Sequence, residues 1–162
     1  MLKLKWLVAL VLLVIVAQPS SADARAKIQG IWRLVSFEVE FQATGERQNF
    51  MGENPTGYII FTPEGRMTVI ITKEGRKPAT TEQDRADLYK SLVAYTGLYR
   101  VEGDKWITKV DVSANPAWVG TEQTRSFKID GNRLQESTAV MQFAAQPEKG
   151  MVRYVLTYEK AK

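Results

Sequence analysis

Residues 30–37 read GIWRLVSF, and this stretch carries the strongest indication of fold in the chain. From there onward apolar side chains recur at every second position, at Val35, Phe37, Val39 and Phe41. A period of two predicts a β-strand over residues 32–41 with one buried face. Trp32 and Leu34 have the opposite parity, so a bulge after Leu34 would bring both apolar sets to the same side of the sheet.

The rest of the chain repeats short β-rich runs that are separated by turns. The further predicted strands cover residues 57–62, 66–72, 97–101, 106–113, 121–130, 133–143 and 150–159. Residues 81–94 differ, because Thr81 and Asp84 form a helix-capping pattern that apolar residues follow at helical spacing. Antiparallel strands in this number can close on themselves. The sequence thus predicts an all-β chain, an antiparallel barrel of about eight strands with one helix after the third strand.

The N-terminus has the organisation of a secretory signal peptide. Two lysines precede an apolar run over residues 6–17, and an Ala-x-Ala sequence ends at Ala24. The run is shorter than the roughly 20 apolar residues that span a bilayer. We expect cleavage after Ala24, with Ala22 as the alternative site. Residues 1–24 then form the signal peptide, and residues 25–162 form one periplasmic or secreted barrel domain without a stable membrane anchor.

The composition excludes several classes of function. The chain has no His and no Cys, which removes most zinc sites, Cys nucleophiles and His-based catalytic triads. It also has no nucleophile elbow, P-loop, dinucleotide-binding motif or Asp-rich calcium loop, so neither a cofactor nor a metal is predicted. The net charge of +4 is spread along the chain, which argues against nucleic acid as a partner.

The predicted strand over residues 121–130 places an arginine inside the barrel. Phe127 and Ile129 need burial, and Gln123 and Arg125 share their parity, so these polar side chains also point inward. An inward arginine is costly unless it is paired. The strand therefore predicts a polar site in the barrel interior.

A two-residue turn at residues 131–132 supplies a partner for this arginine. The turn sets Phe127 opposite Glu136 and Arg125 opposite Thr138, so Glu136 lies diagonal to Arg125 on the inner face. Two interpretations stay open. Either the pair is a structural ion pair inside the barrel, or it is a polar anchor that orients a ligand in a cavity.

Aromatic side chains are further candidates for the cavity wall. Tyr154 has the inward parity of the last strand, and Tyr99 is a second candidate. Trp118 lies in a proline-containing loop, where it either caps the barrel or lines its entrance. The predicted ligand-binding residues are therefore Arg125, Gln123, Glu136, Tyr99, Trp118 and Tyr154.

Together these segments resemble the lipocalin-like domain family. The resemblance rests, in matching order, on residues 30–37, 57–67, 94–99, 115–127 and 158–160. It implies a calycin-type β-barrel in which Trp32 plugs one end and Gly30 lets the chain turn in beneath it. Lys160 is then expected to lie across the Trp32 ring, as a structural cation–π contact of about 1 kcal/mol.

The chain departs from the family pattern in three places. Members often carry a His where this chain has Thr108 and Lys109, so any role of that His is excluded here. Glu136 occupies a position that is commonly apolar, which makes its pairing with Arg125 particular to this chain. Residues 158–160 read Tyr-Glu-Lys in place of the usual Trp-x-Arg.

The function that we expect is non-covalent binding of a small, largely apolar molecule inside the barrel of an exported protein. The molecule would be hydrophobic or amphipathic. One alternative is an enzyme of isomerase or cyclase type that acts in the cavity. Another is an accessory protein with a filled barrel that acts through its surface. The interior volume separates these alternatives, because a filled barrel is compatible only with the last.

Overall fold

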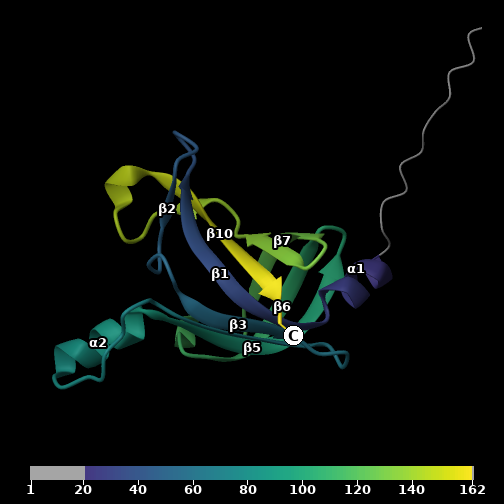
Figure 1. Ribbon diagram of the computed structural model, residues 1–162, viewed down its shortest axis with the longest axis horizontal. Helices are drawn as coiled ribbons and strands as arrows, with labels where there is room; N and C mark the ends of the chain where they lie inside the picture. The colour runs from purple at the N-terminus through teal and green to yellow at the C-terminus, as the bar shows by residue number, and fades with distance from the viewer. Residues whose placement is uncertain (1–20, 162) are drawn as a thin grey trace, which may run out of the picture.

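The computed structural model describes residues 21–161, and the apolar run of the predicted signal peptide lies outside them. Two helices and ten strands make up most of the described chain (Figure 1). In chain order the elements are α1 Ser21–Ile28, β1 Gly30–Phe41, β2 Arg47–Asn49, β3 Thr56–Phe61, β4 Arg66–Thr72, α2 Glu82–Lys90, β5 Leu92–Glu102, β6 Lys105–Ser113, the 3₁₀ turn η1 Pro116–Trp118, β7 Glu122–Asp130, β8 Arg133–Ser137, β9 Met141–Gln142, the 3₁₀ turn η2 Pro147–Lys149 and β10 Met151–Lys160. Among the described residues, no helix is long and apolar enough to cross a membrane.

Eight of the strands close into one antiparallel barrel. Their order is β1-β3-β4-β5-β6-β7-β8-β10, and β10 pairs back with β1. The short β2 pairs with the C-terminal half of β1, and β9 pairs with the first residues of β10. These two strands extend the sheet without interrupting the closure. The predicted all-β barrel is therefore confirmed.

Strand β1 contains the predicted bulge. Its register with β10 shifts between Leu34 and Ser36, which leaves Val35 as the extra residue. Trp32 and Leu34 before the shift and Phe37 after it are all buried. One irregularity thus turns two apolar sets of opposite parity toward the same core.

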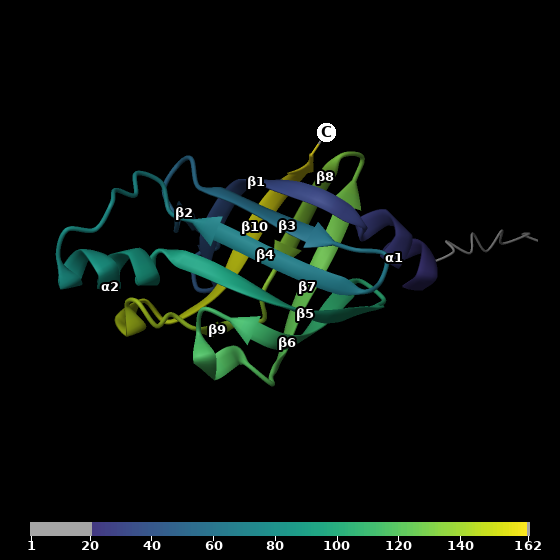
Figure 2. The same ribbon diagram turned by 90° about the horizontal axis from the view of Figure 1, so that it is seen from below.

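Helix α1 lies at one end of the barrel (Figure 2), and Trp32 closes this end against the last residue of the helix. The Trp32 side chain is 1% exposed, and its indole N–H donates to the Ile28 carbonyl at 2.7 Å. Lys160 Nζ lies 4.3 Å from the centre of the indole, as predicted, and also donates to the Gln29 carbonyl. Gly30 has a φ of 116°, and a Cβ there would lie 3.0 Å from the Lys160 side chain. The chain therefore needs glycine where it passes beneath the plug.

Helix α1 covers this closed end, and the sequence does not predict it. Ile28 is fully buried in the main core, and Ala24 is buried as well. Arg25 donates to the Pro63 carbonyl at 3.1 Å and lies 5.8 Å from the centre of the Tyr99 ring. The helix is thus attached to the barrel through its last turns.

Helix α2 begins as predicted but ends earlier. Thr81 caps it: the Thr81 hydroxyl accepts from the Asp84 N–H, and the Asp84 carboxylate accepts from the Thr81 N–H. Hydrogen bonds from Thr80 and Thr81 lower the pKa of Asp84 to about 2. The predicted continuation beyond Lys90 is wrong, because Leu92 begins β5 and pairs with β4. The helix buries no side chain and extends from the end of the barrel opposite α1 (Figure 2).

The strand predicted to follow β7 is divided into β8 and β9. The ladder between β7 and β8 sets Phe127 opposite Glu136, as predicted, but stops before Arg125. Thr138 bonds to β10 instead: its N–H donates to the Tyr154 carbonyl at 3.0 Å, and its hydroxyl accepts from the Tyr154 N–H at 3.0 Å. The predicted pairing of Thr138 with Arg125 is therefore not formed.

Candidate functional site

A cavity of about 340 Å³ lies inside the barrel, toward the end that carries α2. Strands from both sides of the barrel contribute to its wall, together with the segment before β3 and the turn η1. Most of the wall is apolar or aromatic, and one charged pair is set into it. The lining residues are Phe37, Phe50, Met51, Val69, Ile71, Lys90, Val93, Tyr95, Trp118, Gln123, Arg125, Glu136, Thr138, Met141, Tyr154 and Leu156.

Aromatic rings form two opposite parts of this wall. On one side Tyr154 meets Phe37 edge to face, with ring centres 5.6 Å apart, and lies 4.8 Å from the ring of Phe50. On the other side Trp118 meets Tyr95 edge to face at 5.5 Å. Such arrangements are favourable for aromatic pairs and hold the rings in fixed orientations. The wall is therefore a firm apolar surface.

The charged pair consists of Arg125 and Glu136. Arg125 Nε lies 3.7 Å from Glu136 Oε2, and the two side chains are 14% and 5% exposed. The Tyr158 hydroxyl donates to Glu136 Oε1 at 2.8 Å, so both carboxylate oxygens face a partner. Arg125 Nη1 donates to the Thr124 carbonyl at 2.9 Å. The inward arginine and its predicted partner are thus confirmed as a buried ion pair.

Burial changes the proton affinity of the groups around this pair. It raises the pKa of the Glu136 carboxyl, while the charge of Arg125 and the hydrogen bond from Tyr158 act in the opposite direction. Burial also raises the pKa of Tyr95 to about 12. Burial and the nearby Glu136 charge raise the pKa of Tyr158 well above its ordinary value. Both phenols therefore keep their protons at neutral pH and can donate hydrogen bonds.

The raised pKa of Glu136 predicts a pH-dependent stability difference between the wild type and Glu136→Gln, whose side chain does not titrate. The folded protein binds this proton more tightly than the unfolded chain does. The resulting stabilisation is present below the ordinary pKa of 4.5 and is lost as the pH rises through the folded-state value. We expect the unfolding free energy of the wild type, relative to the variant, to fall as the pH rises above the ordinary pKa of 4.5 in urea titrations. A difference that rises with pH contradicts the direction of the shift.

Five of the six predicted ligand-binding residues line the cavity: Gln123, Arg125, Glu136, Trp118 and Tyr154. They come from β7, β8, β10 and the turn η1, and the barrel brings them together. Trp118 is only partly buried and belongs to the wall, which agrees with the entrance-lining alternative. The part that these residues play in binding stays a prediction.

Tyr99 is the exception, and its assignment to the cavity is corrected. It packs at the closed end, where its ring lies 5.1 Å from that of Phe61 and its hydroxyl donates to the Thr62 carbonyl at 3.3 Å. Tyr95, four residues earlier in strand β5, lines the cavity instead. Both tyrosines point inward, and parity alone does not indicate how far along a strand the core is filled.

Three lining residues lie outside any pattern that the sequence offers. Phe50 and Met51 precede β3, in a segment without periodicity, and Lys90 ends α2. The available signal was the presence of two adjacent large apolar residues in an otherwise polar segment. The hydrogen bond of Tyr158 to Glu136 is not predicted either, because it depends on the register between β8 and β10.

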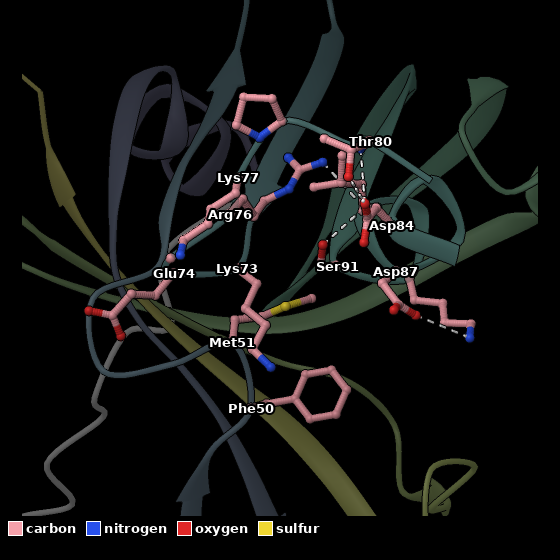
Figure 3. A pocket seen from close by; sticks show the side chains of 14 residues that line it. Phe50, Met51, Lys73, Glu74, Arg76, Lys77, Thr80, Asp84, Asp87 and Ser91 are labelled. Atoms are coloured by element: carbon pink, nitrogen blue, oxygen red, sulfur yellow. Dashed lines mark hydrogen bonds and ion pairs between the residues drawn. The ribbon is translucent and has the colours of Figure 1, made fainter. Parts of the chain in front are cut away.

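An open groove of about 890 Å³ adjoins the cavity (Figure 3). It lies between α2 and the segment after β4, and it shares Phe50, Met51 and Lys90 with the cavity wall. Its remaining side chains are mostly polar or charged and face solvent. The groove is therefore suited to be a way into the cavity rather than a site for an apolar molecule.

Among residues 21–161, no group of three or more acidic side chains is arranged to hold a metal ion. The charged groups near the cavity are engaged with one another, as in the Arg125–Glu136 pair. The site is thus a small apolar chamber with one ion pair in its wall, whose two opposite charges cancel.

One comparison with known proteins, a match to a family model, agrees with this architecture. The lipocalin-like domain family matches residues 29–161, which include every strand of the barrel. No curated protein matches the chain. A solved structure titled "Structure of EF1p2_mFAP2b bound to DFHBI" has a TM-score of 0.45 and 11% identity, over 88% of this chain and 100% of that chain. On the family match, together with the closed eight-stranded barrel, this chain belongs to the lipocalin-like domain family.

Proposed function

We propose that this protein is exported and that it binds a small, largely apolar molecule in the interior cavity. The observation that carries the proposal is the 340 Å³ chamber itself, with aromatic walls and one charged pair. Sites for small molecules are typically apolar hollows of roughly 300–1,000 Å³ with a few polar groups that orient the ligand. The adjoining groove offers a path between the chamber and solvent.

The cavity also bears on the two alternatives. A barrel filled with its own side chains would not leave this volume, which argues against an accessory protein that acts only through its surface. An isomerase or cyclase needs a general acid or base whose proton or lone pair faces the substrate. Glu136 faces Tyr158 with one oxygen and Arg125 with the other. Its geometry therefore favours binding over proton transfer.

A cavity-filling substitution tests the binding site. Val69 is buried in the cavity wall, whereas Val112 points outward from the same barrel and is 63% exposed. We expect Val69→Phe to weaken binding of the apolar fluorophore N-phenyl-1-naphthylamine at least about tenfold, because the added ring occupies the chamber. The matched control Val112→Phe should bind as the wild type does. Equal affinities in a fluorescence titration of all three proteins would place the fluorophore outside the chamber.

Export is tested separately by the N-terminus of the protein that is recovered outside the cytoplasm. We expect it to begin at Arg25, which keeps the contacts of Arg25 with Pro63 and Tyr99. Cleavage there removes the first half of α1 but leaves Ile28, which accepts the hydrogen bond from Trp32. Edman sequencing that begins at Met1 would contradict the proposed signal peptide.

A further inference from the structure

Four side chains form a polar block at the inner end of the cavity. Strands β6 and β7 pair there, with Trp106 opposite Arg125 and Thr108 opposite Gln123. Gln123 and Arg125 line the cavity, while Trp106 and Thr108 are fully buried beside them. Cross-strand partners on one face of an antiparallel pair are in side-chain contact range. The block thus continues from the cavity wall into the core.

The block holds hydrogen-bonding groups that have no partner within the described part of the chain. Trp106 Nε1 and Thr108 Oγ1 are buried and make no hydrogen bond within the described part of the chain. Tyr95 lines the cavity, and its hydroxyl remains a donor at neutral pH because burial raises its pKa to about 12. Arg125 has five N–H donors and gives a hydrogen bond to the Thr124 carbonyl. A guanidinium can only donate, so a group in the cavity that complements Arg125 is an acceptor.

The charge of this region is balanced. Arg125 Nε lies 3.7 Å from Glu136 Oε2, and the positive and negative charges oppose each other in a setting where water screens them little. A carboxylate that approached Arg125 would also approach Glu136 and be repelled by it. A neutral acceptor meets the same N–H groups without that repulsion. The pair therefore selects against an anionic ligand.

We propose that the bound molecule is uncharged and carries a carbonyl-type acceptor, as in a ketone, aldehyde, ester or amide, which accepts hydrogen bonds from Arg125 and Tyr95. This proposal rests on the proposed function, since it names the chemical class of the molecule in the same cavity. The apolar remainder of the molecule lies between the Phe37–Tyr154 and Tyr95–Trp118 walls. The acceptor end lies toward Gln123 and Arg125.

Three probes of one shape separate acceptor chemistry from apolar contact. 2-Acetylnaphthalene has the neutral acceptor, 2-naphthoate has the anion, and 2-isopropylnaphthalene has a hydrocarbon group of the same outline. We expect the wild type to bind the ketone about tenfold more tightly than either of the others, in calorimetric titrations at pH 8. The hydrocarbon should still bind measurably through apolar contact alone.

Two variants show whether the charge balance causes this preference. Glu136→Gln keeps an acceptor for Tyr158 but leaves the charge of Arg125 unopposed, so 2-naphthoate should overtake the ketone. Arg125→Met combined with Glu136→Leu removes both charges and the Arg125 donors, so the preference for the ketone over the hydrocarbon should shrink to what the Tyr95 hydroxyl alone supports. The double variant keeps the test decisive if Glu136→Gln does not fold.

The outcomes test the proposed ligand class separately from the proposed binding function. Binding of all three probes with equal affinity, or preference of the wild type for 2-naphthoate, overturns the neutral-acceptor class while binding in the cavity stands. A ketone preference that is undiminished in the double variant also overturns it, because the acceptor would then lie away from Arg125. Failure of the wild type to bind any probe, including the hydrocarbon, overturns the proposed binding function as well.

Discussion

Replacing Trp32 by alanine should lower the free energy of unfolding by about 3–5 kcal/mol. The indole fills the closed end of the barrel, donates to the Ile28 carbonyl and lies beneath the Lys160 ammonium. Truncation removes a large buried side chain, and it leaves a cavity that the surrounding strands cannot collapse to fill, because the barrel ladder fixes their spacing. Urea unfolding followed by circular dichroism measures the loss.

Trp118→Ala is the matched control for this substitution. It also removes an indole, but from the cavity wall, where the ring is only partly buried. Trp118→Ala should lower the free energy of unfolding clearly less than Trp32→Ala does. A loss below about 1 kcal/mol for Trp32→Ala would mean that this indole does not act as the plug of the barrel.

Replacing Arg125 by methionine should be comparably damaging, with a loss of about 3–5 kcal/mol at neutral pH. The substitution leaves the Glu136 carboxylate buried without its cation, although Tyr158 still donates to it. Adding Glu136→Leu removes the isolated charge, so the double variant should regain most or all of the lost stability. Urea unfolding of the wild type, Arg125→Met, Glu136→Leu and the double variant completes the double-mutant cycle.

The Arg66–Asp111 pair on the barrel surface serves as the control. Its two hydrogen bonds, at 2.8 and 3.0 Å, are shorter than the contact between Arg125 and Glu136, but both side chains are more than two-fifths exposed. Water already solvates these charges, so Arg66→Met should change stability little. If Arg125→Met is as mild as Arg66→Met, then Glu136 is not held as a buried charge.

The sequence was sufficient for the features that depend on a period of two. The bulge after Leu34 follows from two apolar sets of opposite parity, and the structure places the register shift there. The approach of Glu136 to Arg125 follows from parity and a two-residue turn, which together set Phe127 opposite Glu136. In both cases burial of one face leaves a single register that satisfies every side chain.

Features that depend on tertiary packing were not predictable in this way. The residues of α1 have no amphipathic pattern, and the helix is held by contacts of Ile28 and Arg25 with the barrel. The C-terminal limit of α2 was misplaced because apolar residues at helical spacing can also begin a strand. Tyr99 and Tyr95 share a face, and only the depth of the filled core decides which of them meets the cavity.

The central claim is that the barrel encloses a small, largely apolar molecule, and native mass spectrometry of the gently purified protein tests it most directly. We expect the wild type and Val112→Phe to carry a small-molecule adduct that denaturing conditions release into a solvent extract. The Val69→Phe protein should lack it, because the added phenyl ring fills the chamber. A wild-type protein that has only the mass of its polypeptide, and that takes up none of the naphthalene probes when they are added, would contradict the claim.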